Sequence, residues 1–214
     1  MAIEDSDFNI FKQMRNKYPQ GGSCAILGDC HFYGMSIDHF KQVMGFDRLD
    51  TFDVNGNPTH KLDLNYELGE EFKGQYDWVI DSGTIYCCFD PAMVFKNILH
   101  MLKADGCVCH TGNLIGFFGR GFYSLSPALF RDFYKTNGFY IEYIGVKQRS
   151  GFWKGINSND TYLNSMNLDF SPVSTTFVPH VPNDSMICCC AKRVKLLENF
   201  VKPVPQHFID TEGK

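Results

Sequence analysis

Acidic residues follow three apolar runs of this chain, at places where side chains can bind ligands. Asp53 and Asp63 stand near the ends of two runs, and Asp81-Ser82-Gly83 ends a third, Trp78-Val79-Ile80. In an open α/β sheet the carboxyl ends of the strands border the ligand crevice, where a carboxylate can accept two hydrogen bonds from a ribose diol. The acids therefore predict a ribose-bearing ligand, and turn or helix capping is the alternative.

The apolar runs are the strands that must position these acids. A continuous apolar run such as Trp78-Val79-Ile80 suits a central strand covered on both faces. Ser36, Asp90 and Ser126 are helix-capping residues ahead of apolar residues at helical spacing. Strands are predicted at 23–27, 48–53, 60–65, 76–80, 107–112, 139–145 and 186–191, and helices at about 7–17, 36–44, 90–102 and 126–137. This alternation predicts an α/β fold.

The composition limits the classes of molecule that the chain is expected to bind. The chain has 214 residues, which favours one domain with insertions, and its net charge of -4 argues against binding nucleic acid or an anionic membrane. The short basic cluster Lys192-Arg193-Val194-Lys195 is interpreted as a solvated strand end and linker. We divide the chain into an N-terminal helix (1–22), a main domain (23–194) with 146–184 as an insertion or cap, and a tail (195–214).

The positions of the cysteines and the composition of the N-terminal segment indicate the cellular compartment of the protein. Nine cysteines fall mostly inside apolar runs, as expected for buried thiols in a reducing compartment. No paired C-x-x-C motif is present, so no metal is predicted. The first thirty residues lack a basic segment followed by an apolar one, and no run approaches the ~20 apolar residues of a membrane span. We expect a cytoplasmic protein.

Several motifs give the chain a resemblance to a known family. The order of strands, with acids at the ends of the second, third and fourth, is similar to that of class I S-adenosylmethionine-dependent methyltransferases. A bacterial methyltransferase-like group with a degenerate glycine motif is the most similar. The motifs are Leu27-Gly28-Asp29, Leu62-Asp63-Leu64-Asn65, Val79-Ile80-Asp81-Ser82-Gly83-Thr84, Phe89-Asp90 and Gly121-Phe122-Tyr123-Ser124-Leu125-Ser126-Pro127. The resemblance covers about residues 24–145.

The resemblance implies a fold, a cofactor and a role for each strand end. The implied fold is Rossmann-like, with a seven-stranded, mostly parallel sheet, helices on both faces and an antiparallel last strand. The implied cofactor is S-adenosyl-L-methionine. By resemblance, Gly28 and Asp29 line its methionine end, Asp53 its ribose, Asp63 and Leu64 its adenine edge, and Asp81, Ser82 and Gly83 the floor beneath its sulfonium.

The residues that would contact the methyl acceptor are of several kinds. His110, at the end of the fifth strand, is the candidate base because the pKa of histidine lies near physiological pH, and a hydrogen-bonded strand-end histidine is the alternative. Tyr86 is a second catalytic candidate, because Tyr86-Cys87 stands where the group has Glu-His. His31 and Tyr33 are placed in the first loop to face the substrate or form a lid.

Arg120 and Tyr123 are the remaining substrate candidates. Arg120 replaces the histidine of the group's Gly-His-Gly segment, in a loop with several aromatic residues. A guanidinium binds a carboxylate or phosphate through two parallel hydrogen bonds. Stacking of an exposed arginine on an aromatic ring is the alternative.

The leading hypothesis is transfer of a methyl group to oxygen or nitrogen of a small-molecule metabolite. Two alternatives stay open: a catalytically degenerate binding or interaction module, and a methyltransferase fold used for a different reaction. The predicted partner is a small molecule, with a homodimer as a possibility.

Overall fold

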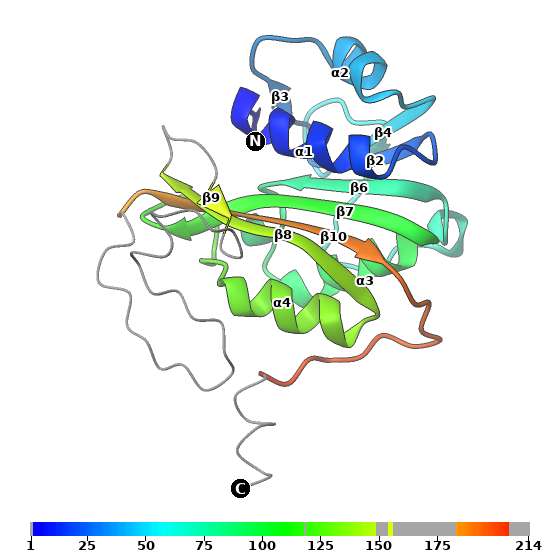
Figure 1. Cartoon of the computed structure of the whole chain (residues 1–214), viewed down its shortest axis with the longest axis vertical. Coiled ribbons are helices and arrows are strands. Elements are labelled where there is room, and N and C mark those ends of the chain that lie inside the picture. Colours follow the sequence, from blue (N-terminus) through cyan, green and yellow to red (C-terminus); the bar gives the residue numbers. More distant parts are fainter. Residues whose placement is uncertain (1, 118, 149–153, 156–182, 206–214) are drawn as a thin grey trace, which may run out of the picture.

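The computed structural model describes residues 2–117, 119–148, 154–155 and 183–205, and its centre is one eight-stranded sheet (Figure 1). The strand order across the sheet is β5-β4-β2-β6-β7-β10-β8-β9. The strands are β2 (Ser23–Leu27), β4 (Arg48–Asp53), β5 (His60–Lys61), β6 (Tyr76–Ser82), β7 (Leu102–Ile115), β8 (Phe139–Gln148), β9 (Lys154–Gly155) and β10 (Ser185–Arg193).

Strand directions follow the predicted pattern. The strands from β5 to β7 are parallel to one another, whereas β10 is antiparallel to both β7 and β8. β9 adds a two-residue antiparallel edge beside β8. The predicted seven-stranded, mostly parallel sheet with an antiparallel last strand is therefore confirmed, and β9 extends it.

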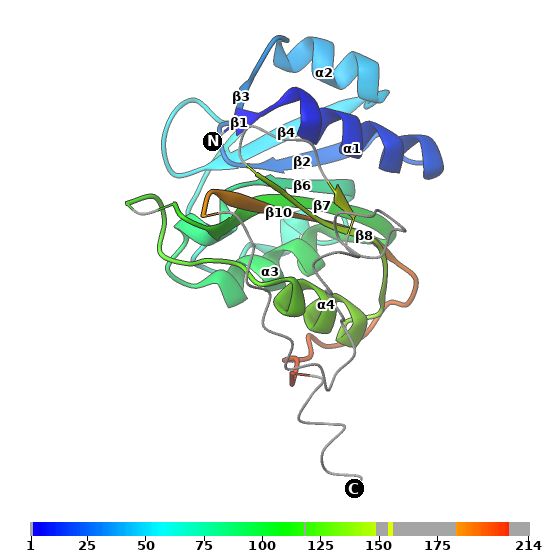
Figure 2. The same ribbon diagram turned by 60° about the vertical axis from the view of Figure 1, so that its left-hand side comes forward.

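Helices cover both faces of the sheet (Figures 1 and 2). α1 (Asp5–Lys17) and α2 (Ile37–Met44) lie on one face, and α3 (Pro91–Met101) and α4 (Pro127–Thr136) lie on the other. β6 has side chains in both cores, because alternate residues of a strand point to opposite faces. Trp78 packs with Phe40 of α2, and Val79 packs with Phe95 of α3.

Helix starts agree closely with the capping signals. The side chains of Ser36, Asp90 and Ser126 each accept a hydrogen bond from the backbone amide three residues later. These bonds satisfy amides that the first helical turn leaves without partners. α1 begins two residues before the predicted start, at Asp5, and the Glu4 amide donates to the carboxylate of Asp7.

Several predicted boundaries differ from those in the structure. The third strand ends at Lys61 instead of residue 65, because the carboxylate of Asp63 accepts the amide of Asn65 and turns the chain. β7 begins at Leu102, directly after α3, instead of at residue 107. The predicted loop 29–34 contains a short strand, β3 (His31–Phe32), which pairs with β1 (Ala2–Ile3).

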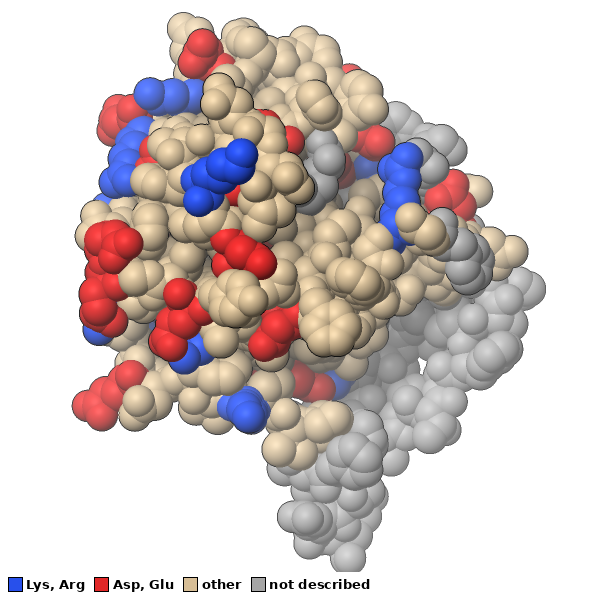
Figure 3. All heavy atoms as spheres, turned by 180° about the vertical axis from the view of Figure 1, so that it is seen from behind, with Lys and Arg blue, Asp and Glu red and all other residues tan. Residues whose placement is uncertain are grey.

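The basic cluster 192–195 is not simply a solvated strand end. Arg193 is 4% exposed, and its guanidinium donates to the carbonyls of Leu99, Leu102 and Lys103 at the end of α3. Burial lowers its pKa to about 10. On the face shown in Figure 3, acidic and basic side chains of the described residues are interspersed instead of forming one basic area.

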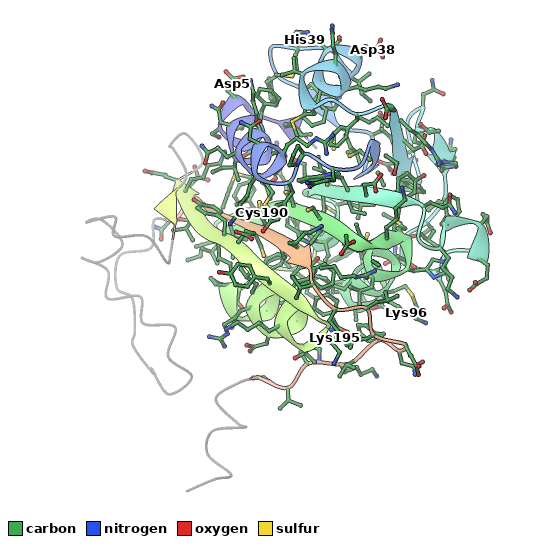
Figure 4. All side chains as sticks on the ribbon, turned by 45° about the vertical axis from the view of Figure 1, so that its right-hand side comes forward. Asp5, Asp38, His39, Lys96, Cys190 and Lys195 are labelled. Atoms are coloured by element: carbon green, nitrogen blue, oxygen red, sulfur yellow. The ribbon has the colours of Figure 1, made fainter. Side chains whose placement is uncertain are left out.

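Cysteine burial agrees with the sequence interpretation at every position but one. Eight of the nine thiols are buried, including Cys190 inside the sheet (Figure 4), whereas Cys87 is exposed. The expectation of buried thiols is therefore correct for Cys88 and wrong for its neighbour Cys87. Among the described residues no helix is long and apolar enough to cross a membrane. The proposed cap 146–184 lies mostly outside the described residues.

Candidate functional site

The strand order reverses direction between β2 and β6. The chain runs outward from β2 to β4 and β5, and then returns to β6 on the other side of β2. Leu27 pairs with Asp81 at this point, and the hydroxyl of Thr84 donates to the carbonyl of Leu27 at 2.6 Å. Ligands of open α/β sheets bind beyond the carboxyl ends of the strands at such a reversal.

Asp53 ties the loops after β2 and β4 together. Its carboxylate accepts the backbone amide of Asp29 at 2.7 Å and that of Asn55 at 3.0 Å. The Gly28 amide donates to the carbonyl of Phe52 at 2.6 Å, next to these bonds. A carboxylate has about four lone-pair sites, so the half-buried Asp53 keeps acceptor capacity for a ligand.

Hydrogen bonds connect the turn after β5 to α3. Asp63 accepts both the amide and the side-chain nitrogen of Asn65, whose own oxygen accepts the amide of Asp90 at the helix cap. Leu64 is buried, and its carbonyl accepts the side chain of Asn97 at 3.1 Å. These bonds hold Asp63 and Leu64 in a fixed position at the carboxyl edge of the sheet.

Asp81 is a buried carboxylate with three donors. One oxygen accepts the amides of Thr84 at 2.7 Å and Ile85 at 3.2 Å, and the other lies 2.8 Å from Nδ1 of His110. Ser82, the next residue, donates its hydroxyl to the carbonyl of Ala2 at 2.9 Å. The end of β6 is therefore held by a neighbouring strand and by the N-terminal segment.

The acids at the three strand ends converge in space, as the sequence predicts. Burial, together with the negative charges of Asp81, Asp63 and Asp53, raises the pKa of the Cys88 thiol to about 12. The strand register places the acids at one edge of the sheet, because Leu27 pairs with both Phe52 and Asp81, and Asp53 pairs with Lys61, two residues before Asp63.

Tyr86 lies between the end of β6 and the loop after β7. A Cβ atom added to Gly83 would lie 3.2 Å from the Tyr86 hydroxyl oxygen, and one added to Gly121 would lie 2.4 Å from its ring. The carbonyl of Tyr86 also accepts the amide of Phe122 at 2.8 Å. The sequence does not reveal that these glycines make room for one ring, although their number in this loop is a signal.

A cavity of about 210 Å³ opens in the loop after β7. It is lined by Asn113, Gly116, Phe117, Gly119, Arg120, Gly121, Phe122, Tyr123 and Ser124. Arg120 and Tyr123, two of the predicted substrate residues, are thus brought together. Asn113, which we did not predict, lines the same cavity and is 5% exposed.

Comparison with known proteins identifies the architecture. No family model matches the chain, and no curated protein matches it. Solved structures do match. A Burkholderia thailandensis 1,6-didemethyltoxoflavin-N1-methyltransferase, solved with 1,6-didemethyltoxoflavin and S-adenosylhomocysteine, has a TM-score of 0.53 at 10% identity over 88% of this chain and 79% of that one.

Two further solved structures, also of methyltransferases, have a similar fold. The N-methyltransferase NodS of Bradyrhizobium japonicum, solved with S-adenosyl-l-homocysteine, has a TM-score of 0.51 at 9% identity, over 90% of this chain and 89% of that one. An S-adenosylmethionine-dependent methyltransferase of Mesorhizobium loti has a TM-score of 0.50 at 12% identity, over 85% and 96%. The chain has the class I methyltransferase fold.

Within this methyltransferase fold, His110 does not occupy the position expected of a base. The side chain is buried, with Nδ1 beside Asp81 and Nε2 beside the hydroxyl of Tyr134. Phe95 and Phe130 pack near its ring. Both ring nitrogens are thus engaged in the interior, and this geometry matches the alternative weighed from the sequence, a hydrogen-bonded histidine.

His31 and Tyr33 lie at a different place in the methyltransferase fold from Arg120. Both are exposed and belong to the β1–β3 side of the carboxyl edge, where the amide of Tyr33 donates to the carbonyl of Ile3. They do not line the cavity beside Arg120. In the described part of the chain, no group of three His, Cys, Asp or Glu side chains is arranged to hold a metal ion.

Proposed function

We propose that the chain is an S-adenosylmethionine-dependent methyltransferase that acts on oxygen or nitrogen of a small-molecule metabolite. The observation that carries the proposal is the placement of Asp53, Asp63 and Asp81 at one edge of the sheet, at the strand reversal beside Gly28. The methyltransferase fold supports it, and so do the two similar enzymes solved with S-adenosylhomocysteine.

The residues at the carboxyl edge suit the parts of this cofactor. Asp53 retains acceptor sites for the ribose hydroxyls, and Asp63 with the buried Leu64 is assigned to the adenine edge. We assign Gly28 and Asp29 to the methionine end. We assign Asp81, Ser82 and Gly83 to the floor, where Asp81 acts through the backbone that it fixes.

When bound, the cofactor supplies a methyl group on a positively charged sulfur, which an acceptor atom displaces in line. The chain then has to hold the acceptor, orient it and exclude water. Tyr86 lies beside Gly83 and the loop that carries Arg120 and Tyr123, which suits it to contact an acceptor. His31 and Tyr33 are assigned to the opposite rim of the same edge.

Calorimetric titration with S-adenosylhomocysteine tests the proposal. We expect saturable binding by the wild-type chain and its loss in Asp53→Ala, because the ribose loses its acceptor. Asp105→Ala is the matched control, since Asp105 is exposed and lies at the start of β7, near the opposite edge of the sheet. Absence of binding to the wild-type chain would refute the proposal, as would equal binding by Asp53→Ala.

A catalytically degenerate binding module is the second candidate. It is favoured by the bonds that the carboxylates already make inside the protein, most of all the three donors to Asp81. Incubation with S-adenosylmethionine and a metabolite mixture separates the two functions. Release of S-adenosylhomocysteine together with a methylated product supports the methyltransferase, and binding without turnover supports the module.

A further inference from the structure

The cavity after β7 has the lining of a binding site for a specific class of molecule. We propose that it holds a small planar anion, with the anionic group on Arg120 and an N–H or O–H donor on Oδ1 of Asn113. Its role as the methyl-acceptor site rests on the proposed function. The ligand chemistry itself is argued from the cavity.

Asn113 carries a buried acceptor that lacks a donor. Its Oδ1 atom has no hydrogen-bond partner among the described residues, while its Nδ2 atom donates to the carbonyl of Tyr123 at 3.3 Å. Buried polar groups are nearly always paired, and an unpaired one lowers stability. A ligand that brings an N–H or O–H group to this atom would supply the missing partner.

Arg120 supplies the positive charge. The residue is exposed, and within the described ranges its side chain makes no hydrogen bond or ion pair. Among the described residues that line the cavity, none is acidic and would neutralise it. An exposed guanidinium without such partners favours a carboxylate or phosphate, which it binds through two parallel hydrogen bonds.

Aromatic rings set the shape of the ligand. Phe117, Phe122 and Tyr123 line the cavity, and Phe122 also packs edge-on against the exposed Phe89 with ring centroids 5.7 Å apart. Ring faces favour a planar partner through stacking. The volume of about 210 Å³ is below the ~300–1,000 Å³ of pockets for drug-sized ligands, so it suits a single ring.

Tyr86 places this cavity next to the proposed cofactor floor. Its ring lies against the positions of Gly83 and Gly121, and its carbonyl accepts the amides of Phe122 at 2.8 Å and Tyr123 at 3.3 Å. Tyr86 therefore contacts both Gly83, which is assigned to the cofactor floor, and Gly121, which lines the cavity, so one side chain joins the two places. This neighbourhood is what a transfer between two bound molecules requires.

Three probes test the ligand chemistry by calorimetry in the presence of S-adenosylhomocysteine. They are 4-aminobenzoate, benzoate and aniline, of which only the first has both a donor and an anionic group. With the wild-type chain we expect 4-aminobenzoate to bind about 3- to 10-fold more tightly than benzoate, from one hydrogen bond. We expect it to bind at least about 10-fold more tightly than aniline, from the charge-assisted pair.

Single substitutions test which residue causes each preference for 4-aminobenzoate over the other two probes. Asn113→Leu should abolish the preference over benzoate, and Asn113→Asp, which keeps an acceptor oxygen, should retain it. Arg120→Gln should abolish the preference over aniline. Lys135→Gln, which removes an exposed charge near the end of α4, should change neither. Asn113→Leu removes the unpaired acceptor and also the hydrogen bond from Nδ2 to the Tyr123 carbonyl, so its circular dichroism and thermal midpoint are measured beside those of the wild-type chain to show that the variant folds.

The outcomes separate this proposal from the proposed function. Binding of S-adenosylhomocysteine without binding of any probe, or with equal binding of all three, overturns the site and leaves the methyltransferase proposal standing. If the cofactor product does not bind but the probe preferences and their loss in the variants are observed, the site stands and the methyltransferase proposal falls.

Discussion

Nδ1 of His110, inside β7, lies 2.8 Å from Oδ2 of Asp81, near the end of β6, and both side chains are buried. The two residues are also direct partners in the strand register. The second oxygen of Asp81 accepts the amides that begin the turn after β6. One buried carboxylate therefore joins two central strands to the segment that carries Tyr86.

Removal of this carboxylate should strongly destabilise the fold. Asp81→Ala is expected to lower the free energy of unfolding by ~3–5 kcal/mol, because two buried amides and His110 lose their acceptor. Asp81→Asn keeps one acceptor oxygen and should lose only ~1–3 kcal/mol. Urea unfolding followed by circular dichroism measures both. Equal losses in the two variants would show that the hydrogen bonds are unimportant.

Two glycines of the loop after β7 make a matched pair for testing the role of Tyr86. Gly119 and Gly121 have φ angles of 79° and 75°, so alanine costs about 1 kcal/mol or more of backbone strain at either position. Of the two, only Gly121 would bring the new Cβ atom against Tyr86, at 2.4 Å, whereas at Gly119 no atom of the described residues lies within 4 Å.

We therefore expect Gly121→Ala to be the more destabilising substitution, by ~1–3 kcal/mol beyond Gly119→Ala. Urea unfolding of both variants gives the difference. It should be accompanied by weaker binding of 4-aminobenzoate in Gly121→Ala alone. If the two variants behave alike, the Tyr86 ring does not depend on Gly121.

Cys87 should be the accessible thiol of the native protein. The other eight cysteines are buried, and burial together with the charges of Asp81 and Asp53 raises the pKa of Cys87, which slows its reaction relative to a free thiol. We expect one thiol to react with a disulfide reagent in the native state and nine after unfolding. S-adenosylhomocysteine should slow the native reaction, because Cys87 lies near the acids assigned to the cofactor.

Cys87→Ser provides the control for this measurement, since it should remove the native reaction and leave the reactions of the buried thiols. A rate that does not change on addition of S-adenosylhomocysteine would place the ligand elsewhere.

Asp77 should contribute a pH-dependent part of the stability. Burial opposes its ionisation, but the hydroxyl and amide of Ser23 and the charge of Lys103 outweigh burial and hold its pKa below 3.8. A carboxyl group whose pKa is lowered by folding stabilises the folded state above its unfolded pKa, and this contribution is lost as the pH falls through the folded value.

Asp77→Asn is therefore expected to be less stable at neutral pH and to lose less stability between about pH 5 and pH 2 than the wild-type chain. Urea unfolding at stepped pH measures the slope. Asp105→Asn, which removes an exposed carboxylate, is the control and should keep the wild-type slope. An unchanged slope in Asp77→Asn would contradict the prediction.

The sequence by itself determined the elements and the edge of the sheet on which the site lies. Strand runs, the caps Ser36, Asp90 and Ser126, and the acids at or near the ends of β4, β5 and β6 could be predicted because each signal lies within a few neighbouring residues. Parallel strands then bring their carboxyl ends to one edge, so convergence of Asp53, Asp63 and Asp81 follows from order along the chain.

Only the tertiary structure decided what each side chain at that edge does. His110 is a hydrogen-bonded histidine of the interior because Asp81 and Tyr134, from other segments, engage both of its ring nitrogens. The path of the loop after β7 leaves the side-chain oxygen of Asn113 without a partner among the described residues and places Tyr86 against Gly121. Residue spacing within the loop does not encode this path. Burial and hydrogen-bond partners depend on contacts between distant segments, whereas secondary structure depends largely on neighbours along the chain.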